Sequence, residues 1–212
     1  MGYGSKVRGP IAMTSNKMVW LFCGFLLAVG VGFEFQGDAG RQLLRYQSDF
    51  HVNHEYWRLM TAHLVHLGWS HFIVNALALV LIFLMYADCF TVKIWLASFL
   101  VLCFGVSLSL MVFYPELQWY LGMSGVLHGL LASALGFSLL KRIYKFTSEF
   151  GVEDFVLFTG LVGKLVYEQI IGSLPFTQSA SGGSVVINAH LYGAITGCIW
   201  ALFLFKFTHS NK

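Results

Sequence analysis

The sequence is 212 residues long, and 57% of these residues are hydrophobic while only 11% are charged. Soluble domains are roughly half apolar and roughly one quarter charged, so this composition excludes an ordinary soluble protein and indicates an integral membrane protein. The net charge of +3 is small and spread along the chain, and it gives no reason to expect a nucleic-acid partner. A lipid bilayer is therefore the first partner that the sequence predicts.

Long hydrophobic runs predict the fold class. A helix rises about 1.5 Å per residue, so about 18 or more apolar residues cross a hydrocarbon core of ~30 Å. The sequence predicts an all-α membrane protein, a six-transmembrane-helix bundle that forms a single domain over residues 1–212. The predicted spans lie near 18–36, 70–87, 93–113, 122–140, 154–171 and 185–207.

The basic residues predict how the bundle lies in the membrane. Six spans place both ends of the chain on one side, and only Arg41, Arg45 and Arg58 fall on the other side. By the positive-inside rule the tails 1–17 and 208–212 are predicted to be cytoplasmic. The basic residues on that side are Lys6, Arg8, Lys17, Lys93, Lys141, Arg142, Lys145, Lys206 and Lys212.

The first external connection, 37–69, is the longest loop and mixes charged with apolar and aromatic residues. That mixture is typical of short helices in the membrane interface, although Trp57-Arg58 equally fits a plain headgroup anchor. His63 and His66 are predicted to stabilise this loop. With a further histidine at 71 they could form a zinc site, but no acidic residue or HExxH pattern accompanies them, so we predict no metal.

The four cysteines, Cys23, Cys89, Cys103 and Cys198, lie in or beside apolar runs without CxxC spacing. We interpret them as packing residues. The uncharged segment 173–184, between the fifth and sixth predicted spans, is expected on the external side.

The stretch GMSGVLHG (122–129) places a serine between glycines at the start of the fourth predicted span. A lone serine in a span is usually a small packing residue. Here Gly122 and Gly125 leave the backbone free to turn and let another chain approach the hydroxyl closely. Ser124 at a helix N-terminus also lies beside unpaired amide groups that can hold an oxyanion. Ser124 is therefore a candidate nucleophile.

A serine nucleophile needs a base, and histidine is the usual one. His190 lies near the outer end of the sixth predicted span, at a depth comparable to Ser124. Gly193 and Gly197 follow it at helical spacing, so one face of this span is nearly free of side chains. Gly125 and Gly129 provide a matching face on the fourth span. We predict that these two spans touch, with Ser124 and His190 at the outer end of the contact.

Two further groups retain polar side chains at membrane depth, which is costly without partners or a function. His71 and Asn75 are four residues apart on one face of the second predicted span and are candidate donors to an oxyanion, although they could equally satisfy loop carbonyls. Lys164 and Glu168 are also four apart, so they can pair; a contact with substrate is the alternative.

Three separated stretches resemble the rhomboid family of intramembrane serine proteases: YWRLMTAHLVHLGWSHFIVNALAL (56–79), GMSGVLHG and AHLYGAITG (189–197). The resemblance implies a Ser–His dyad of Ser124 and His190 without a third acidic residue. It also implies an oxyanion hole of His71, Asn75 and the Ser124 amide, and no cofactor. A bacterial inner membrane protein with its active site open to the periplasm is expected.

Finer features resemble the rhombosortase subfamily: the form SGxLHG, the compact core and KLVYEQ (164–169). Rhombosortases are associated with GlyGly-CTERM proteins, whose C-terminal tail has a Gly-rich motif, one hydrophobic helix and a basic end. This implies cleavage of single-span substrates with such a tail, with water or an amine-bearing lipid as the acceptor. The alternatives are a general rhomboid protease and a non-catalytic six-span membrane binding protein or small transporter.

Many bacterial rhomboids have a tyrosine four residues after the serine, where this chain has His128. One helical turn beyond Ser124, His128 is expected on the face toward the sixth span. We hypothesise that it stacks on or hydrogen-bonds to His190 and orients that ring, as a third group does in other hydrolases. A satisfied core histidine is the alternative.

Overall fold

The computed structural model describes residues 17–145, 152–175, 177 and 185–210, and most of the described chain is helical. The long helices are α1 (Lys17–Glu34), α4 (Trp69–Tyr86), α5 (Val92–Phe113), α6 (Ser124–Lys145), α7 (Val152–Ile171) and α9 (Ile187–Ser210). The short elements are α2 (Gly37–Leu44), β1 (Tyr46–Gln47), α3 (Arg58–Thr61), η1 (Ala87–Cys89) and β2 (Trp119–Tyr120). The predicted all-α membrane bundle is confirmed.

Five of the described helices, α1, α4 with η1, α5, α6 and α9, are long and apolar enough to cross a membrane. The fifth predicted span, 154–171, corresponds to α7, which has 20 residues but carries Glu153, Asp154, Lys164 and Glu168. Helix α7 is long enough to cross a membrane, but its four charged side chains lower its apolar character and distinguish it from those five helices. The charges make α7 the exceptional helix of the bundle.

The predicted ends of the spans agree with the helices to within a few residues, with two larger differences. Helix α6 continues past residue 140 to Lys145, and α9 continues into the predicted tail as far as Ser210. Basic residues near a helix C-terminus interact favourably with the helix dipole, so each helix can extend beyond its apolar residues. Residues 1–16 and 211–212 of the predicted tails, and most of segment 173–184, lie outside the described residues.

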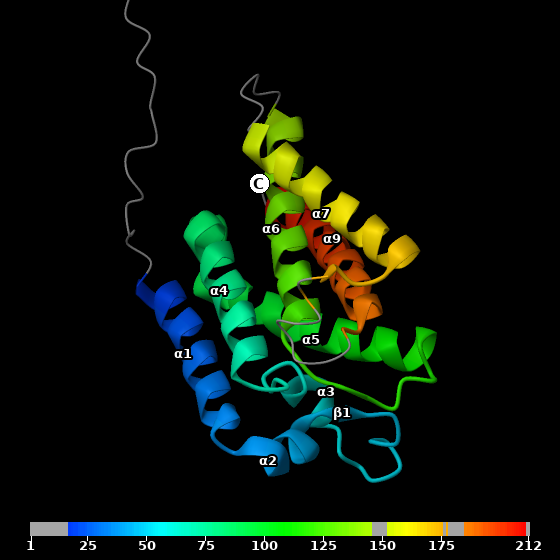
Figure 1. Ribbon diagram of the computed structural model, residues 1–212. Helices are drawn as coiled ribbons and strands as arrows, with labels where there is room; N and C mark the ends of the chain where they lie inside the picture. Colours follow the sequence, from blue (N-terminus) through cyan, green and yellow to red (C-terminus); the bar gives the residue numbers. More distant parts are fainter. Residues whose placement is uncertain (1–16, 146–151, 176, 178–184, 211–212) are drawn as a thin grey trace, which may run out of the picture.

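Helix α6 lies in the middle of the bundle, with α4 on one side of it and α7 and α9 on the other (Figure 1). The short elements of the connection 37–69 gather at one end, where α4, α6 and α9 begin and α7 ends (Figure 1). Short helices, predicted for this connection, are present as α2 and α3. This arrangement brings four helix ends together above one layer of loop.

The loop layer is tied to the strand before α6. Tyr46 pairs with Tyr120 and Gln47 with Trp119 in an antiparallel two-stranded sheet. Arg58 is buried and satisfies the carbonyl oxygens of Gln42 and Arg45, each at 2.8 Å. Buried polar groups need such partners, so the guanidinium holds the folded loop together.

The core fills the space between α1, α4, α5 and α6. Phe83 stacks on Trp95 with ring centroids 4.7 Å apart, and both side chains are fully buried. Cys23 and Cys103 are buried in this core, and the other two cysteines pack against it, as predicted.

Helices α6 and α9 pack with their backbones in direct contact. A Cβ atom added to Gly129 would lie 2.8 Å from the carbonyl oxygen of Gly193, and one added to Gly193 would overlap the carbonyl of Gly125. Only glycine fits at such distances, so the predicted glycine contact of these helices is present. Ser133 closes the contact by donating to the carbonyl oxygens of Gly129 at 2.7 Å and Gly197 at 3.2 Å.

Candidate active site

Ser124 is the first residue of α6, and a sharp turn at Gly122 places it there. Gly122 has a φ of +118°, a conformation that other residues rarely adopt. Its N–H donates to the Ala62 carbonyl at 2.9 Å, and its own carbonyl accepts a hydrogen bond from the Tyr120 hydroxyl at 2.7 Å. A Cβ atom at this position would also lie 2.8 Å from Cε1 of His71. The positive φ and the lack of space for a Cβ atom both explain why residue 122 is a glycine.

His190, near the start of α9, lies against Ser124. Its Nε2 is 2.9 Å from Ser124 Oγ, although the two residues are 66 positions apart in the chain. A Cβ at Gly125, next to the serine, would lie 2.9 Å from the Ala189 carbonyl oxygen, next to the histidine. The close backbone packing of α6 on α9 thus sets the hydroxyl-to-imidazole distance, and the predicted contact is present.

His128 covers the other side of the His190 ring. The two imidazoles stack with centroids 4.2 Å apart and planes 16° apart. Nδ1 of His128 lies 2.6 Å from the carbonyl oxygen of Ser124, one turn earlier in α6. The predicted stacking is present, and this backbone contact keeps the His128 ring from turning.

Lys164 and Glu168 of α7 reach into the same group. They pair with each other at 2.8 Å, as predicted. Glu168 Oε2 also lies 2.9 Å from His190 Nδ1, and Lys164 Nζ lies 2.6 Å from His128 Nε2 and 3.0 Å from His190 Nδ1. The structure thus differs from the expectation of a pair without a third acidic residue.

The sequence held a signal for this contact that its interpretation missed. Two opposite charges one helical turn apart at membrane depth indicate a shared face. The spacing does not predict which helix this face contacts, because an i, i+4 pattern describes one helix and not the neighbour against which that helix packs. The pairing was therefore predicted, and the approach of Glu168 to His190 was not.

His71 and Asn75 lie at the start of α4, on the opposite side of Ser124 from α9. The Leu67 N–H points at His71 Nδ1 over 3.4 Å, so Nδ1 is the acceptor and Nε2 carries the proton. Asn75 Nδ2 donates to the His71 carbonyl at 2.9 Å. An amide nitrogen has two hydrogens, so one remains for a further acceptor.

A cavity of about 410 Å³ unites the candidate residues, and its lining includes His71, Asn75, Ser124, His128, Lys164 and His190. A second, mostly apolar cavity of about 540 Å³ between α4, α6 and α7 shares four lining residues with it: Ala78, Leu127, His128 and Lys164. The polar group therefore stands at the end of an apolar groove.

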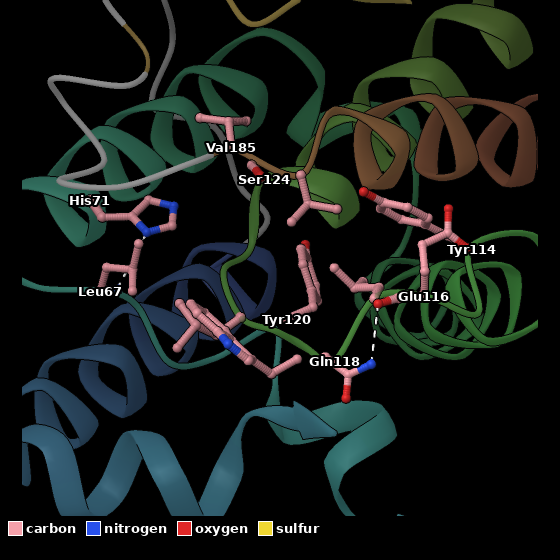
Figure 2. A pocket seen from close by; sticks show the side chains of 12 residues that line it. Leu67, His71, Tyr114, Glu116, Gln118, Tyr120, Ser124 and Val185 are labelled. Atoms are coloured by element: carbon pink, nitrogen blue, oxygen red, sulfur yellow. Dashed lines mark hydrogen bonds between the residues drawn. The ribbon is translucent and has the colours of Figure 1, made fainter. Parts of the chain in front are cut away.

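On the loop side, His71 and Ser124 also face a hollow of about 240 Å³ (Figure 2). Figure 2 shows Tyr120 and Gln118 among its other walls, with Glu116 and Tyr114 at one side of the hollow. Ser124 thus lies where an apolar groove and a more polar hollow meet. A chain could pass the hydroxyl from either direction.

Two buried histidines support the loop beneath Ser124. Nε2 of His63 lies 3.0 Å from the Cys103 carbonyl and 2.9 Å from Ser107 Oγ, and its ring packs against Tyr120. Burial lowers the pKa of His63 to about 4. His66, whose ring nitrogens have no hydrogen-bond partner within the described chain, has a pKa lowered by burial to about 3. Both are therefore neutral at pH 7, which fits their predicted role in the loop.

The site includes a group of metal-ligating types. One ligand atom each of His128, Glu168 and His190 lie within 4.8 Å of one another. The Lys164 ammonium already lies at hydrogen-bond distance from all three side chains, so a metal ion would have to displace it. The cation that these residues hold in this arrangement is the lysine.

The comparison with known families agrees with the geometry. A rhomboid domain model matches residues 53–207, which include the loop histidines, the glycine contact of α6 with α9 and every residue of the candidate site. No curated protein matches the sequence. The family match covers well over half of the chain. The chain belongs to the rhomboid domain family and is, at the level of that family, a multi-pass intramembrane serine protease.

Proposed function

We propose that this rhomboid protein cleaves peptide bonds within the membrane with Ser124 as the nucleophile and His190 as its base. The observation that carries the proposal is the distance of 2.9 Å between Ser124 Oγ and His190 Nε2. A general base must lie within about 2.6–3.2 Å of the proton it removes. The cavity of about 410 Å³ beside this pair leaves room for a substrate backbone.

The reaction follows from the atoms around the pair. The hydroxyl proton of Ser124 moves to His190 Nε2 while Oγ attacks the scissile carbonyl carbon. The negative charge on the carbonyl oxygen is held by the Ser124 amide, by Nε2–H of His71 and by the remaining amide hydrogen of Asn75, each donor contributing about 3–4 kcal/mol. His190 then gives the proton to the leaving amine, and an acyl-enzyme on Ser124 remains.

The apolar groove supports a single-span membrane protein as the substrate class. A hydrophobic segment lying between α4 and α7 would meet the polar group where the two cavities join. A helical substrate hides its carbonyls in hydrogen bonds, so it must unwind before attack. Glycine costs a helix about 1 kcal/mol relative to alanine, which makes a Gly-rich junction easy to unwind.

The finer proposal is a rhombosortase that acts on GlyGly-CTERM proteins at the outer face of a bacterial inner membrane, with both termini cytoplasmic. Its support is that the residues that distinguish SGxLHG and KLVYEQ, His128, Lys164 and Glu168, all contact one another or His190. The acyl group would go to water or to an amine-bearing lipid. The loop 37–69 would lie in the outer interface.

The enzymatic part is tested by labelling the detergent-purified protein with a serine-reactive fluorophosphonate. We expect labelling of the wild type and none of Ser124→Ala, with loss of labelling in His190→Ala as well. Equal labelling of wild type and Ser124→Ala would contradict the proposal and leave a non-catalytic membrane protein. Ser133→Ala is the matched control on the same helix, because Ser133 is fully buried against Gly129 and Gly197.

The substrate is tested with a single-span reporter that ends in a Gly-Gly tail, a hydrophobic helix and a basic end, expressed with and without this protein. Mass spectrometry of the product reports the bond that is broken and any group joined to the new C-terminus. Cleavage that is lost when the two glycines become leucines supports a rhombosortase. Equal cleavage of both reporters indicates a general rhomboid protease.

A further inference from the structure

Resting on the proposed function above, we propose that Glu168 is a positioning residue that sets the tautomer of His190, and that Lys164 and His128 hold Glu168 in place. This role differs from the substrate contact considered for Lys164 and Glu168 from the sequence. It is carried by five contacts among four side chains and one backbone carbonyl, each of which admits only certain proton positions.

His128 provides the first fixed proton. Its Nδ1 lies 2.6 Å from the Ser124 carbonyl oxygen, and a carbonyl oxygen only accepts hydrogen bonds, so Nδ1 carries a proton. In a neutral imidazole the other nitrogen is then an acceptor. Nε2 of His128, 2.6 Å from Lys164 Nζ, therefore accepts a hydrogen bond from the ammonium.

Lys164 donates a second hydrogen bond to Glu168 Oε2 at 2.8 Å. Glu168 is completely buried, and a buried carboxylate needs a cation and donors to stay charged. The ammonium also lies 3.0 Å from His190 Nδ1, where Glu168 Oε2 lies at 2.9 Å. Lys164 and Glu168 therefore compete for one nitrogen, the first as a donor and the second as an acceptor.

The outcome of this competition decides whether His190 can act as a base. When Nδ1–H donates to Glu168, the lone pair on Nε2 faces Ser124 Oγ–H and can take its proton. When Lys164 donates to Nδ1, Nε2 carries the proton and cannot. Two hydrogens of the ammonium go to His128 and Glu168, which leaves one hydrogen for Nδ1 at 3.0 Å, whereas two carboxylate oxygens, at 2.9 and 3.2 Å, face the same nitrogen. The geometry favours the base-competent tautomer.

The contacts close a ring that starts and ends at one residue. From the Ser124 carbonyl it passes through His128, Lys164, Glu168 and His190 and returns to the Ser124 hydroxyl. During attack the hydroxyl proton moves to Nε2, and Nδ1 keeps its own proton. Glu168 stabilises the resulting imidazolium without being protonated, and the proton leaves later with the amine.

The first test measures fluorophosphonate labelling as a function of probe concentration, which separates the limiting rate from the half-saturating concentration. Glu168→Gln keeps the shape but loses the charge, and its amide can donate to Nδ1 and hold the wrong tautomer. We expect the limiting rate to fall about 10²–10⁴-fold, with the half-saturating concentration changed less than about twofold. A change confined to the half-saturating concentration would overturn the proposal and indicate a contact with the bound molecule.

Asp154→Asn is the matched control. Asp154 is a second buried carboxylate on α7, bonded to Tyr86 at 3.0 Å and Ser138 at 2.6 Å, and it does not line the cavity around Ser124. We expect it to lower thermal stability without changing the limiting labelling rate of the folded protein. If both variants lose stability and rate to the same extent, Glu168 has only a structural role and the proposal fails.

The second test reads the tautomer directly and needs no catalysis. In protein labelled with ¹⁵N-histidine, with the His190 signals assigned by their loss in His190→Gln, we expect a protonated Nδ1 and an unprotonated Nε2. The reverse tautomer in the wild type, or an unchanged tautomer in Glu168→Gln, would overturn the proposal. A failure of the proposed function is distinguishable, because Ser124→Ala would then label like the wild type whatever the spectra show.

Discussion

The contact of α6 with α9 and the attachment of α7 show two ways of holding a helix in a membrane protein. Between α6 and α9 the glycines let backbone meet backbone, and a Cβ at Gly197 would overlap the Gly129 carbonyl. On α7 the glycines Gly160 and Gly163 face open space, with nothing within 4 Å of an added Cβ. The same residue type is therefore indispensable in one helix and structurally free in the other.

Helix α7 is attached by polar groups instead. At one end Asp154 accepts hydrogen bonds from Tyr86 and Ser138 and pairs with Arg142 at 3.2 Å. At the other end Lys164 and Glu168 contact the histidines of the site. Dense van der Waals packing fixes a distance to a fraction of an ångström, whereas a few hydrogen bonds leave the apolar groove beside α7 open. Ser124 and His190 are held by the close backbone packing of α6 on α9, whereas Glu168 is held on α7 by hydrogen bonds.

The largest effect is expected from Gly193→Ala. The new methyl group would overlap the Gly125 carbonyl, and neither backbone can move without separating α6 from α9. We expect a loss of at least about 3 kcal/mol of stability and no fluorophosphonate labelling, because His190 moves away from Ser124. Thermal unfolding in detergent and labelling measure both. Wild-type stability and labelling would show that the contact is not as close as described.

Acid is expected to weaken the loop beneath the α6–α9 contact. The pKa of His63 is about 4 and that of His66 about 3 in the folded protein, against about 6.5 in an unfolded chain. The unfolded chain therefore binds protons first, and the free energy of unfolding falls as the pH drops from about 6.5 toward 4. For His63 the full loss is on the order of 3 kcal/mol.

The measurement is the unfolding temperature between pH 7.5 and pH 4.5, compared with His63→Gln. Glutamine retains a donor for the Cys103 carbonyl but does not titrate. We expect a shallower dependence on pH in the variant. Identical curves for the two proteins would mean that His63 does not contribute to the acid sensitivity.

A smaller effect is expected from Asp154→Asn. The amide keeps one acceptor oxygen, so it cannot serve Tyr86, Ser138 and Arg142 together, and at least one of these donors loses its contact with residue 154. We expect a loss of about 1–3 kcal/mol, measured by thermal unfolding. An unchanged unfolding temperature would show that this end of α7 is held by its apolar contacts.

The smallest effect is expected from Gly163→Ala, the counterpart of Gly193→Ala on α7. The added methyl group meets no atom within 4 Å, and alanine favours a helix by about 1 kcal/mol over glycine. We expect unchanged labelling and a stability equal to or slightly above that of the wild type. A destabilised Gly163→Ala protein would show that glycine is required on α7 as well as in the contact of α6 with α9.

Much of the fold and part of the site were predictable from local patterns. The hydrophobic runs predicted the long helices to within a few residues, and the glycines at i, i+4 predicted the contact of α6 with α9. The expected contact of Ser124 with His190 followed from that packing. The antiparallel pair of Tyr46 with Tyr120 was not predicted, because two-residue strands carry no periodic signal.

The sequence by itself determined that this is a helical membrane protein and which small and polar residues share a helix face, because apolar length and helical spacing are properties of one segment. Only the tertiary structure decided that Glu168 faces His190 Nδ1, that Lys164 reaches His128 and that Asp154 ties α7 to α4 and α6. Those contacts depend on how far each helix is rotated about its own axis. That rotation is set by the packing of neighbouring helices and is not encoded in the spacing along any one of them.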